Sequence, residues 1–366
     1  MISVSKPIIG DEEIEAVVAV MRSGIIAQGP KVKELEQNFA KYCGTRHAIA
    51  LNSGTAALHG GLYALGIGDN DEVITSPFTF VASANPILML GGKVVFADIS
   101  EENFCIDPLE VEKQITNKTK AIIPVDLYGQ IYDYRKIKKI ADQYSLKLLE
   151  DACQSIGAIQ DNVLAGSFGD AAAFSLYATK NMMCGEGGML TTNDDDIAER
   201  CRRFRHHGQS EQTRYEYWDI GFNYRMMDIQ AAIALVQLNK IDDLNKKRID
   251  NAKKLTAGLV GIKGLILPKI PENDRHVFHQ YTIRVTEDFK ITREKLIESL
   301  KKDDIGAGIY YPKPLHLHPH FSKFGYAPGD FPVAEKMANQ VLSLPVHPGL
   351  TDNELSLIID SIRKYA

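Results

Sequence analysis

The stretch "FSLYATKNMMCGEGGML", residues 174–190, places a single lysine, Lys180, in a run without any other positive charge. An apolar segment precedes this lysine, and residues 185–188 after it consist of three glycines and a glutamate. Apolar surroundings disfavour the ammonium form, so the pKa of the lysine falls and its amine becomes a nucleophile. The glycines allow backbone to approach a ligand closely. The ordinary alternative is a lysine that extends its charge to the surface, and this stretch by itself leaves both open.

The segments around Lys180 alternate between short apolar runs and helical patterns. Strands are expected at 47–51, 72–76, 93–99, 120–127, 146–152, 170–176 and 187–193. Helices are expected at 11–24, 31–44, 54–66, 80–92 and 134–145. Apolar strands that alternate with helices predict an α/β fold with a mostly parallel central sheet covered by helices on both faces.

The character of the chain changes after residue 241. A long charged helix is expected through residues 242–259, followed by a strand at 279–285 and helices at 292–304 and 351–365. These elements predict a smaller C-terminal α+β unit. We therefore expect a large domain over 12–245 and a small domain over 246–366, with residues 1–11 packed against the latter.

Composition narrows the classes of protein. The chain has 366 residues, 45% hydrophobic and 24% charged, with a formal net charge of −5, which argues against a general nucleic-acid binder. Its five cysteines are odd in number and widely spaced, so free thiols in a reducing compartment are expected. The N-terminal segment lacks the features of a signal peptide, and no apolar run is long enough to cross a bilayer. We expect a soluble, cytoplasmic protein.

Two further polar clusters follow predicted strands, at the sheet edge where ligands bind in such folds. In "LNSGTAAL", residues 51–58, a strand ends and Gly54, Thr55 and Ala56 open a helix whose free N–H groups suit a phosphate. In "LLEDACQS", residues 148–155, a strand runs into Asp151 and Gln154. A buried carboxylate there requires a cationic or hydrogen-bonded partner. The alternatives are an ordinary helix cap in the first cluster and a capping box in the second.

The three clusters together supply what pyridoxal phosphate requires. A lysine forms the Schiff base, a carboxylate keeps the pyridine nitrogen protonated, and a helix N-terminus holds the phosphate. Motifs for other cofactors are missing: the chain has neither GxGxxG after a strand nor GxxxxGK[ST], and its cysteines form no metal cluster.

At this point the sequence resembles the DegT-type (DegT/DnrJ/StrS) sugar aminotransferases, which are fold-type I pyridoxal-phosphate enzymes. The resemblance covers essentially the whole chain. The blocks that carry it are "SGIIAQGPKVKELE" (23–36), "NSGTAALHGGLYALGIGDNDEVITSPFTFVASANPI" (52–87), "IIPVDLYGQ" (122–130), "EDACQSIGA" (150–158), residues 174–190, "GFNYRMMDIQAAI" (221–233) and "PLHLHPHF" (314–321).

The resemblance implies a role for each residue that matches these blocks. Lys180 would bond to the cofactor aldehyde and carry the proton, and Asp151 would pair with the pyridine nitrogen. Gln154 would bond the ring 3-hydroxyl, and the phosphate would be held by Gly54, Thr55, Ala56 and Ser175. Phe80 would stack on the ring, and Asn223 would reach the phosphate from the other subunit of a homodimer. Without the resemblance, the sequence would indicate a core position for Phe80 and a turn position for Asn223.

The substrate end of the predicted site is less defined. By resemblance, the residues near the sugar or the amino donor are Gly24, Ile25, Ile26, Ala27, His207, Tyr311 and His316. The motif "HLHPH" spaces three histidines by two residues, but Pro319 interrupts it, so no metal site is expected there.

The function that the resemblance implies is transfer of an amino group from an amino acid, L-glutamate as is usual in the family, to a 3- or 4-keto-deoxysugar nucleotide. The product would be a nucleotide-linked amino sugar for polysaccharide or related biosynthesis. A cyclitol or other non-nucleotide ketone is an alternative substrate that the sequence leaves open. A sugar dehydratase on the same fold carries histidine in place of Lys180, and a non-catalytic sugar sensor would not need Lys180, Asp151 and Gln154 together. We expect neither a nucleic-acid partner nor a membrane partner.

Overall fold

The central sheet has seven strands in the order β1-β9-β8-β5-β4-β2-β3. The computed structural model describes residues 1–210, 213 and 215–366. Strand β9 runs antiparallel to both of its neighbours, and the pairs β8–β5, β5–β4, β4–β2 and β2–β3 are parallel. The strands are β1 (His47–Leu51), β2 (Glu72–Thr75), β3 (Lys93–Phe96), β4 (Thr119–Ile123), β5 (Lys147–Asp151), β8 (Ala171–Ser175) and β9 (Gly188–Thr192). The predicted mostly parallel sheet is confirmed.

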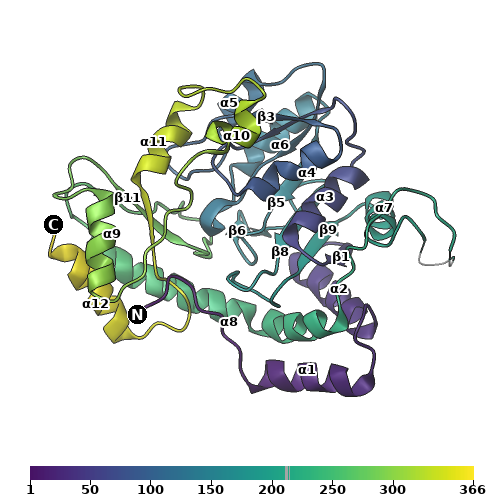
Figure 1. Ribbon diagram of the computed structural model, residues 1–366, viewed down its shortest axis with the longest axis horizontal. Coiled ribbons are helices and arrows are strands. Elements are labelled where there is room, and N and C mark those ends of the chain that lie inside the picture. The colour runs from purple at the N-terminus through teal and green to yellow at the C-terminus, as the bar shows by residue number, and fades with distance from the viewer. Residues whose placement is uncertain (211–212, 214) are drawn as a thin grey trace.

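Helices cover both faces of this sheet, as predicted (Figure 1). Alternate residues of β1 enter two separate cores: Ile49 and Leu51 join one cluster, and Ala48 and Ala50 join the other. This alternation is the period of two expected of a strand buried on both sides. The helices of the first 260 residues are α1 (Asp11–Ser23), α2 (Pro30–Cys43), α3 (Gly54–Ala64), α4 (Asn85–Met89), α5 (Pro108–Lys113), α6 (Tyr134–Gln143), α7 (Asp195–Arg205) and α8 (Asp228–Leu259).

The hairpin that joins β8 to β9 carries the opening stretch of the sequence. Strand β8 ends at Ser175, the chain turns through Lys180, and β9 begins at Gly188. A Cβ atom at Gly188 would lie 2.2 Å from the carbonyl oxygen of Ser53, so only glycine fits beside the start of α3. The lysine turn and the N-terminus of α3 are therefore held against each other.

The C-terminal part contains a second, three-stranded antiparallel sheet of β10 (Leu265–Ile266), β11 (Tyr281–Val285) and β12 (Val341–Leu344). A separate apolar cluster lies around it and includes Ile2, which forms a parallel bridge with Ile305. The helices α9 (Arg293–Lys302) and α12 (Asp352–Arg363) contribute residues to this cluster, whereas α10 (Pro319–Ser322) and α11 (Pro332–Gln340) pack into a core cluster of the large sheet. The proposed boundary at 245/246 falls inside α8, which runs from one part to the other (Figure 1), so the division into domains stays a prediction.

The sequence prediction was wrong for the helix at 80–92. The structure has a 3₁₀ turn at Val81–Ser83 and only a short helix, α4, at Asn85–Met89. Pro86 lies in the first turn of α4, where its fixed φ and missing N–H are tolerated, and this favours a new helix start over a continuous helix. The interruption places Ser83 in the turn, where its side chain reaches Asp151.

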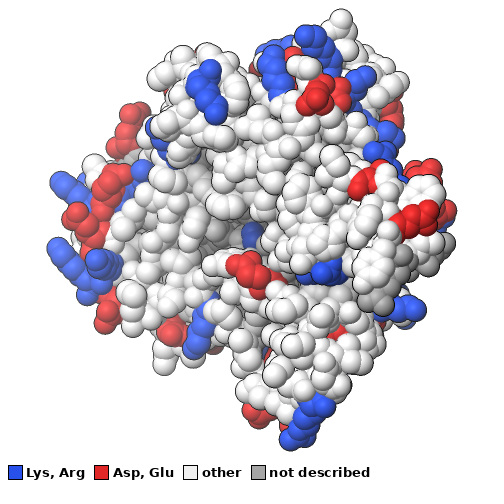
Figure 2. All heavy atoms as spheres, turned by 45° about the vertical axis from the view of Figure 1, so that its right-hand side comes forward, with Lys and Arg blue, Asp and Glu red and all other residues white. Residues whose placement is uncertain are grey.

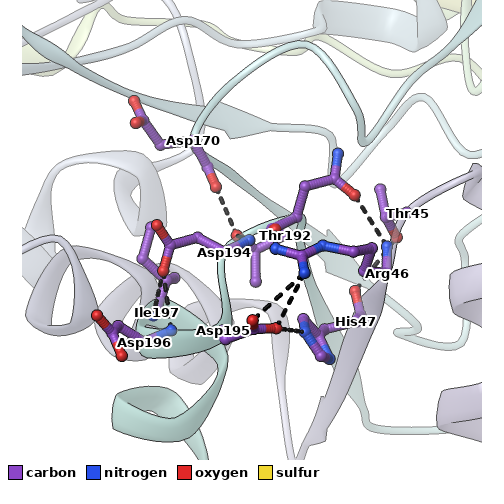
Figure 3. A network of polar contacts seen from close by, with 10 residues as sticks. Thr45, Arg46, His47, Asp170, Thr192, Asp194, Asp195, Asp196 and Ile197 are labelled. Atoms are coloured by element: carbon purple, nitrogen blue, oxygen red, sulfur yellow. Dashed lines mark hydrogen bonds and ion pairs between the residues drawn. The ribbon is translucent and has the colours of Figure 1, made fainter.

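The start of α7 is fixed by a surface network around β1 (Figure 3). Asp194 accepts hydrogen bonds from the N–H groups of Asp196 and Ile197, which caps the helix. Asp195, at the first position of α7, forms exposed ion pairs with Arg46 and His47. These contacts connect α7 to the edge strand of the sheet.

Charged side chains are most numerous around the margin of the face shown in Figure 2, and its centre is hollowed, with basic atoms inside the hollow and an acidic side chain at its rim. Within the described residues, no helix combines the length and hydropathy that a membrane crossing requires.

Candidate active site

A cavity of about 540 Å³ lies at the ends of β5 and β8 and is closed on its other side by residues from the C-terminal part. Its lining residues are Ser53, Gly54, Thr55, Leu58, Thr79, Phe80, Ala82, Ser83, Asp151, Cys153, Gln154, Ser175, Tyr177, Thr179, Lys180, Glu186, His279, Gln280, Tyr310 and Tyr311. Eight of the predicted site residues, from five separate stretches of the chain, therefore face one cavity: Gly54, Thr55, Phe80, Asp151, Gln154, Ser175, Lys180 and Tyr311.

Lys180 is the chemically distinctive residue of this cavity. The backbone N–H of Lys180 donates to the carbonyl oxygen of Tyr177 at 2.8 Å, which fixes the turn after β8. Burial lowers the pKa of the Lys180 amine, and the nearby Cys153 and Asp151 oppose this effect. A lysine with a lowered pKa has more of its amine in the neutral, nucleophilic form.

Asp151 is held in place by a chain of hydroxyl groups. Ser83 Oγ donates to Asp151 Oδ2 at 2.6 Å, and Cys153 N–H donates to Asp151 Oδ1 at 3.2 Å. Because the only hydroxyl hydrogen of Ser83 is used on the carboxylate, Thr79 Oγ1, 2.9 Å away, is the donor to Ser83. All of these side chains except that of Cys153 are buried. The carboxylate is thus oriented before any ligand binds.

Gln154 links the large sheet to the C-terminal part. Its Oε1 accepts the N–H of Tyr128 at 2.9 Å, and its Nε2 donates to the hydroxyl oxygen of Tyr311 at 3.4 Å. The contact with Tyr128 fixes which end of the amide is oxygen, because a backbone N–H requires an acceptor. The Nε2 end therefore faces the cavity as a donor, beside Tyr311.

The N-terminus of α3 is suited to an anion. Ser53 Oγ accepts the N–H of Ala56 at 3.1 Å, and within the described chain the N–H groups of Gly54 and Thr55 have no acceptor. A Cβ atom at Gly54 would lie 2.8 Å from Ser175 Cβ, so glycine lets the helix start directly against the end of β8. Free N–H groups and the positive helix end favour a phosphate at this point.

The remaining predicted residues lie in different surroundings. Ala56 is buried and its N–H already donates to the capping oxygen of Ser53. His316 is fully buried and its Nε2 lies 3.0 Å from Glu335 Oε1. Neither lines the cavity, so the structure does not support a direct cofactor contact for Ala56 or a substrate contact for His316 within one chain. The exposed residues away from the cavity are Gly24, Ile25, Ile26, Ala27, His207 and Asn223.

Several lining residues were missed by the sequence analysis. Ser83 lies in the segment expected to be helical and Thr79 directly precedes Phe80, and the small hydroxyl residues on both sides of Phe80 were the available signal. His279 and Gln280 come just before β11, a strand of the other sheet. Sequence order gave no indication that this segment closes the cavity.

The residues present fit the predicted cofactor. One end of the cavity has the N-terminus of α3, whose first N–H groups are unused. The space beside it exists because Gly54 has no Cβ, which would lie against Ser175. Another part has an oriented carboxylate, Asp151, that faces the same space as the lysine. A phosphate, a protonated ring nitrogen and an aldehyde require these three kinds of partner. Phe80, whose side chain is 56% exposed, offers an aromatic face at the cavity wall.

Comparisons with known proteins agree with this chemistry. The chain is 41% identical to the spore coat polysaccharide biosynthesis protein SpsC of Bacillus subtilis over 98% of its length and 95% of the relative's. It is 38% identical to GDP-perosamine synthase of Caulobacter vibrioides, covering 99% of this chain and 97% of that one. It also matches the crystal structure of S. venezuelae DesV in complex with a ketimine intermediate, with a TM-score of 0.93 and 37% identity over 97% of this chain and 94% of that chain.

The family assignment rests on residues 7–363, which match the model of the DegT/DnrJ/EryC1/StrS aminotransferase family. The fold is the one that the sequence resemblance led us to expect. The chain belongs to the DegT/DnrJ/EryC1/StrS aminotransferase family and is a pyridoxal-phosphate-dependent sugar aminotransferase.

Proposed function

We propose that this enzyme moves the amino group of L-glutamate to the keto carbon, C3 or C4, of a nucleotide-linked deoxysugar. A relative that covers nearly the whole chain is named for a GDP-linked sugar, which supports a nucleotide sugar as the acceptor. The observation that carries the proposal is the half-buried lysine Lys180, with its lowered pKa, in one cavity with the oriented carboxylate of Asp151.

The residues of the cavity have separate roles in this reaction. Bound pyridoxal phosphate supplies an electron sink that stabilises the loss of a proton from the carbon bearing the amine. The Lys180 amine takes that proton and returns it on the other side of the transfer, so it acts as nucleophile and then as general base and acid. Asp151, held by Ser83, would pair with the ring nitrogen of the bound cofactor. The free N–H groups of Gly54 and Thr55 would hold its phosphate.

The reaction is tested by its two halves. Purified enzyme with L-glutamate should release 2-oxoglutarate, and the resulting pyridoxamine form should return to its starting spectrum when mixed with the right keto-sugar nucleotide from a panel of 3- and 4-keto compounds. Lys180→Ala should bind the cofactor without a covalent link and lose turnover. A variant that keeps normal turnover would refute the role of Lys180, and a wild-type protein that releases no keto acid would indicate a sensor.

We also propose that the active unit is a homodimer in which Asn223 completes the partner's cavity. Asn223 is exposed and lies away from the cavity of its own chain. Large apolar side chains on the same segment are strongly exposed: those of Tyr217, Trp218 and Ile220 are 62%, 60% and 79% accessible. Such a group of exposed apolar residues is typical of an interaction surface.

Mixing two inactive variants tests this arrangement. A dimer of one Lys180→Ala subunit and one Asn223→Ala subunit has one site with both defects and one intact site. Statistical exchange of subunits should therefore restore about a quarter of the wild-type activity, because half of the dimers are mixed and half of their sites are intact. If the mixture stays as inactive as its parents after confirmed subunit exchange, Asn223 does not act across the interface.

A further inference from the structure

His279 lies in the wall of the Lys180 cavity but comes from a distant part of the chain. It precedes β11 of the second sheet, whereas Lys180 follows β8 of the first. Its imidazole is half-buried, and its Nδ1 lies 3.3 Å from Oδ1 of Asn181, the residue next to Lys180. The ring is therefore tied through one nitrogen to the same turn that carries the lysine.

The contacts of Asn181 determine which nitrogen of His279 carries hydrogen. Asn181 Nδ2 donates to Val277 O at 2.9 Å and to Asn245 Oδ1 at 2.8 Å, and Asn245 Nδ2 in turn donates to Ile156 O at 2.9 Å. Because backbone carbonyl oxygens only accept, both amide groups have a fixed orientation. Asn181 Oδ1 is thus an acceptor, and Nδ1 of His279 must be the donor.

The surroundings of His279 favour the neutral ring. Burial lowers its pKa well below the ordinary value, the positive charge of Arg248 lowers it further, and Lys180 adds to this effect whenever its amine is protonated. Arg248 is itself buried and donates to the carbonyl oxygen of Phe278, so its charge stays close to the ring. A neutral imidazole with hydrogen on Nδ1 has a lone pair on Nε2. Among the described residues, Nε2 has no hydrogen-bond partner.

We propose that His279 is a positioning residue whose Nε2 accepts an N–H of the Lys180 amine and so directs the amine's lone pair toward the substrate carbon. This inference rests on the proposed function, because it concerns the stage in which Lys180 is a free amine. A neutral amine has two hydrogens and one lone pair, so one fixed hydrogen bond restricts the direction of the lone pair. His279 itself gains or loses no proton when Lys180 takes the proton and later returns it.

Two substitutions separate the two nitrogens of the ring. His279→Asn keeps a donor near the Nδ1 position for Asn181 but removes the acceptor on the cavity side. His279→Gln loses the Nδ1 donor but places an amide oxygen near the Nε2 position. His276→Asn is the control, since His276 is a buried histidine of the same segment that lies outside the Lys180 cavity and accepts the N–H of Phe278 through Nδ1.

The kinetic readout is single-turnover release of 2-oxoglutarate from the loaded enzyme at saturating L-glutamate. We expect His279→Asn to slow this step roughly 100-fold with little change in the glutamate concentration that gives half the maximal rate, because misplacing a reacting group costs about that much. His279→Gln should recover most of the rate, and His276→Asn should stay close to wild type. A wild-type rate in His279→Asn would overturn the proposal, whereas an inactive wild-type enzyme would count against the proposed function itself.

The second readout does not depend on turnover. Nitrogen-15 NMR of histidine-labelled full-length protein, with and without pyridoxal phosphate, reports which ring nitrogen carries hydrogen, and the His279 signal is the one that disappears in His279→Gln. Hydrogen on Nδ1 and a bare Nε2 are expected in both forms. Hydrogen on Nε2 would overturn the proposal. This readout uses the wild-type protein, so it decides the question even if His279→Asn fails to fold.

Discussion

Replacing Ser83 by alanine tests whether the hydroxyl chain really stabilises the buried carboxylate of Asp151. Ser83 Oγ donates to Asp151 Oδ2 at 2.6 Å, and both side chains are buried. A hydrogen bond to a charged group contributes about 1.5–3 kcal/mol to stability. The alanine variant leaves this oxygen of the carboxylate without its donor, so the free energy of unfolding should fall by about 1.5–3 kcal/mol.

The measurement is urea unfolding of the protein freed of cofactor, because bound pyridoxal phosphate would add its own stabilisation to every variant. Thr79→Val should cost less than Ser83→Ala, about 0.5–1.5 kcal/mol, since it removes a bond between two neutral hydroxyl groups. Ser299→Ala is the control, because Ser299 Oγ donates to a carbonyl oxygen on the exposed surface of α9. Equal stability of Ser83→Ala and Ser299→Ala would refute the reasoning.

Three further predictions concern the phosphate cradle, the core and the start of α7. Gly54→Ala places a Cβ 2.8 Å from Ser175 Cβ, so it should destabilise the protein by about 1–3 kcal/mol and weaken pyridoxal phosphate binding in a fluorescence titration. Burial raises the pKa of Glu150 from 4.5 to about 7. The stability that this group contributes is therefore present below pH 4.5 and lost as the pH rises through 7. Urea unfolding at several pH values should show a smaller loss of unfolding free energy across this window in Glu150→Gln than in the wild type. Asp194→Ala should cost about 1 kcal/mol in urea unfolding by removing a helix cap, and Asp195→Ala should cost less because its ion pairs are exposed.

The strands of the large sheet were well predicted because the signal for each strand lies within a short stretch of sequence. Each is a short apolar run next to a turn or a helix start, and burial on both faces leaves little ambiguity in such a run. The segment at 80–92 failed for a physical reason: Pro86 favours a new helix start, and the turn before it is fixed by contacts with Asp151 that lie far away in sequence. Propensity along the chain cannot report such contacts.

The cofactor side of the site was predictable for a similar reason. Asp151 ends a strand of the large sheet, and Gly54 and Lys180 each follow one; strand ends on one edge of a sheet meet in space. His279 and Gln280 precede a strand of the other sheet, so no rule about strand ends could place them. Their position depends on how α8 carries the second sheet over the first, which is a matter of packing between parts of the chain.

Glu150 and Asp151 are adjacent carboxylic acids with different roles, one in the core and one in the cavity. Successive side chains on a strand point to opposite faces of the sheet. Glu150 points into the core, where it accepts the N–H groups of Gly166 and Phe168 and where burial raises its pKa. Asp151 points into the cavity beside Lys180. The sequence analysis placed a carboxylate at the mouth of the sheet, and the period of the strand decides which of the two can reach a ligand. A shift of β5 by one residue would turn Asp151 toward the core and Glu150 toward the cavity.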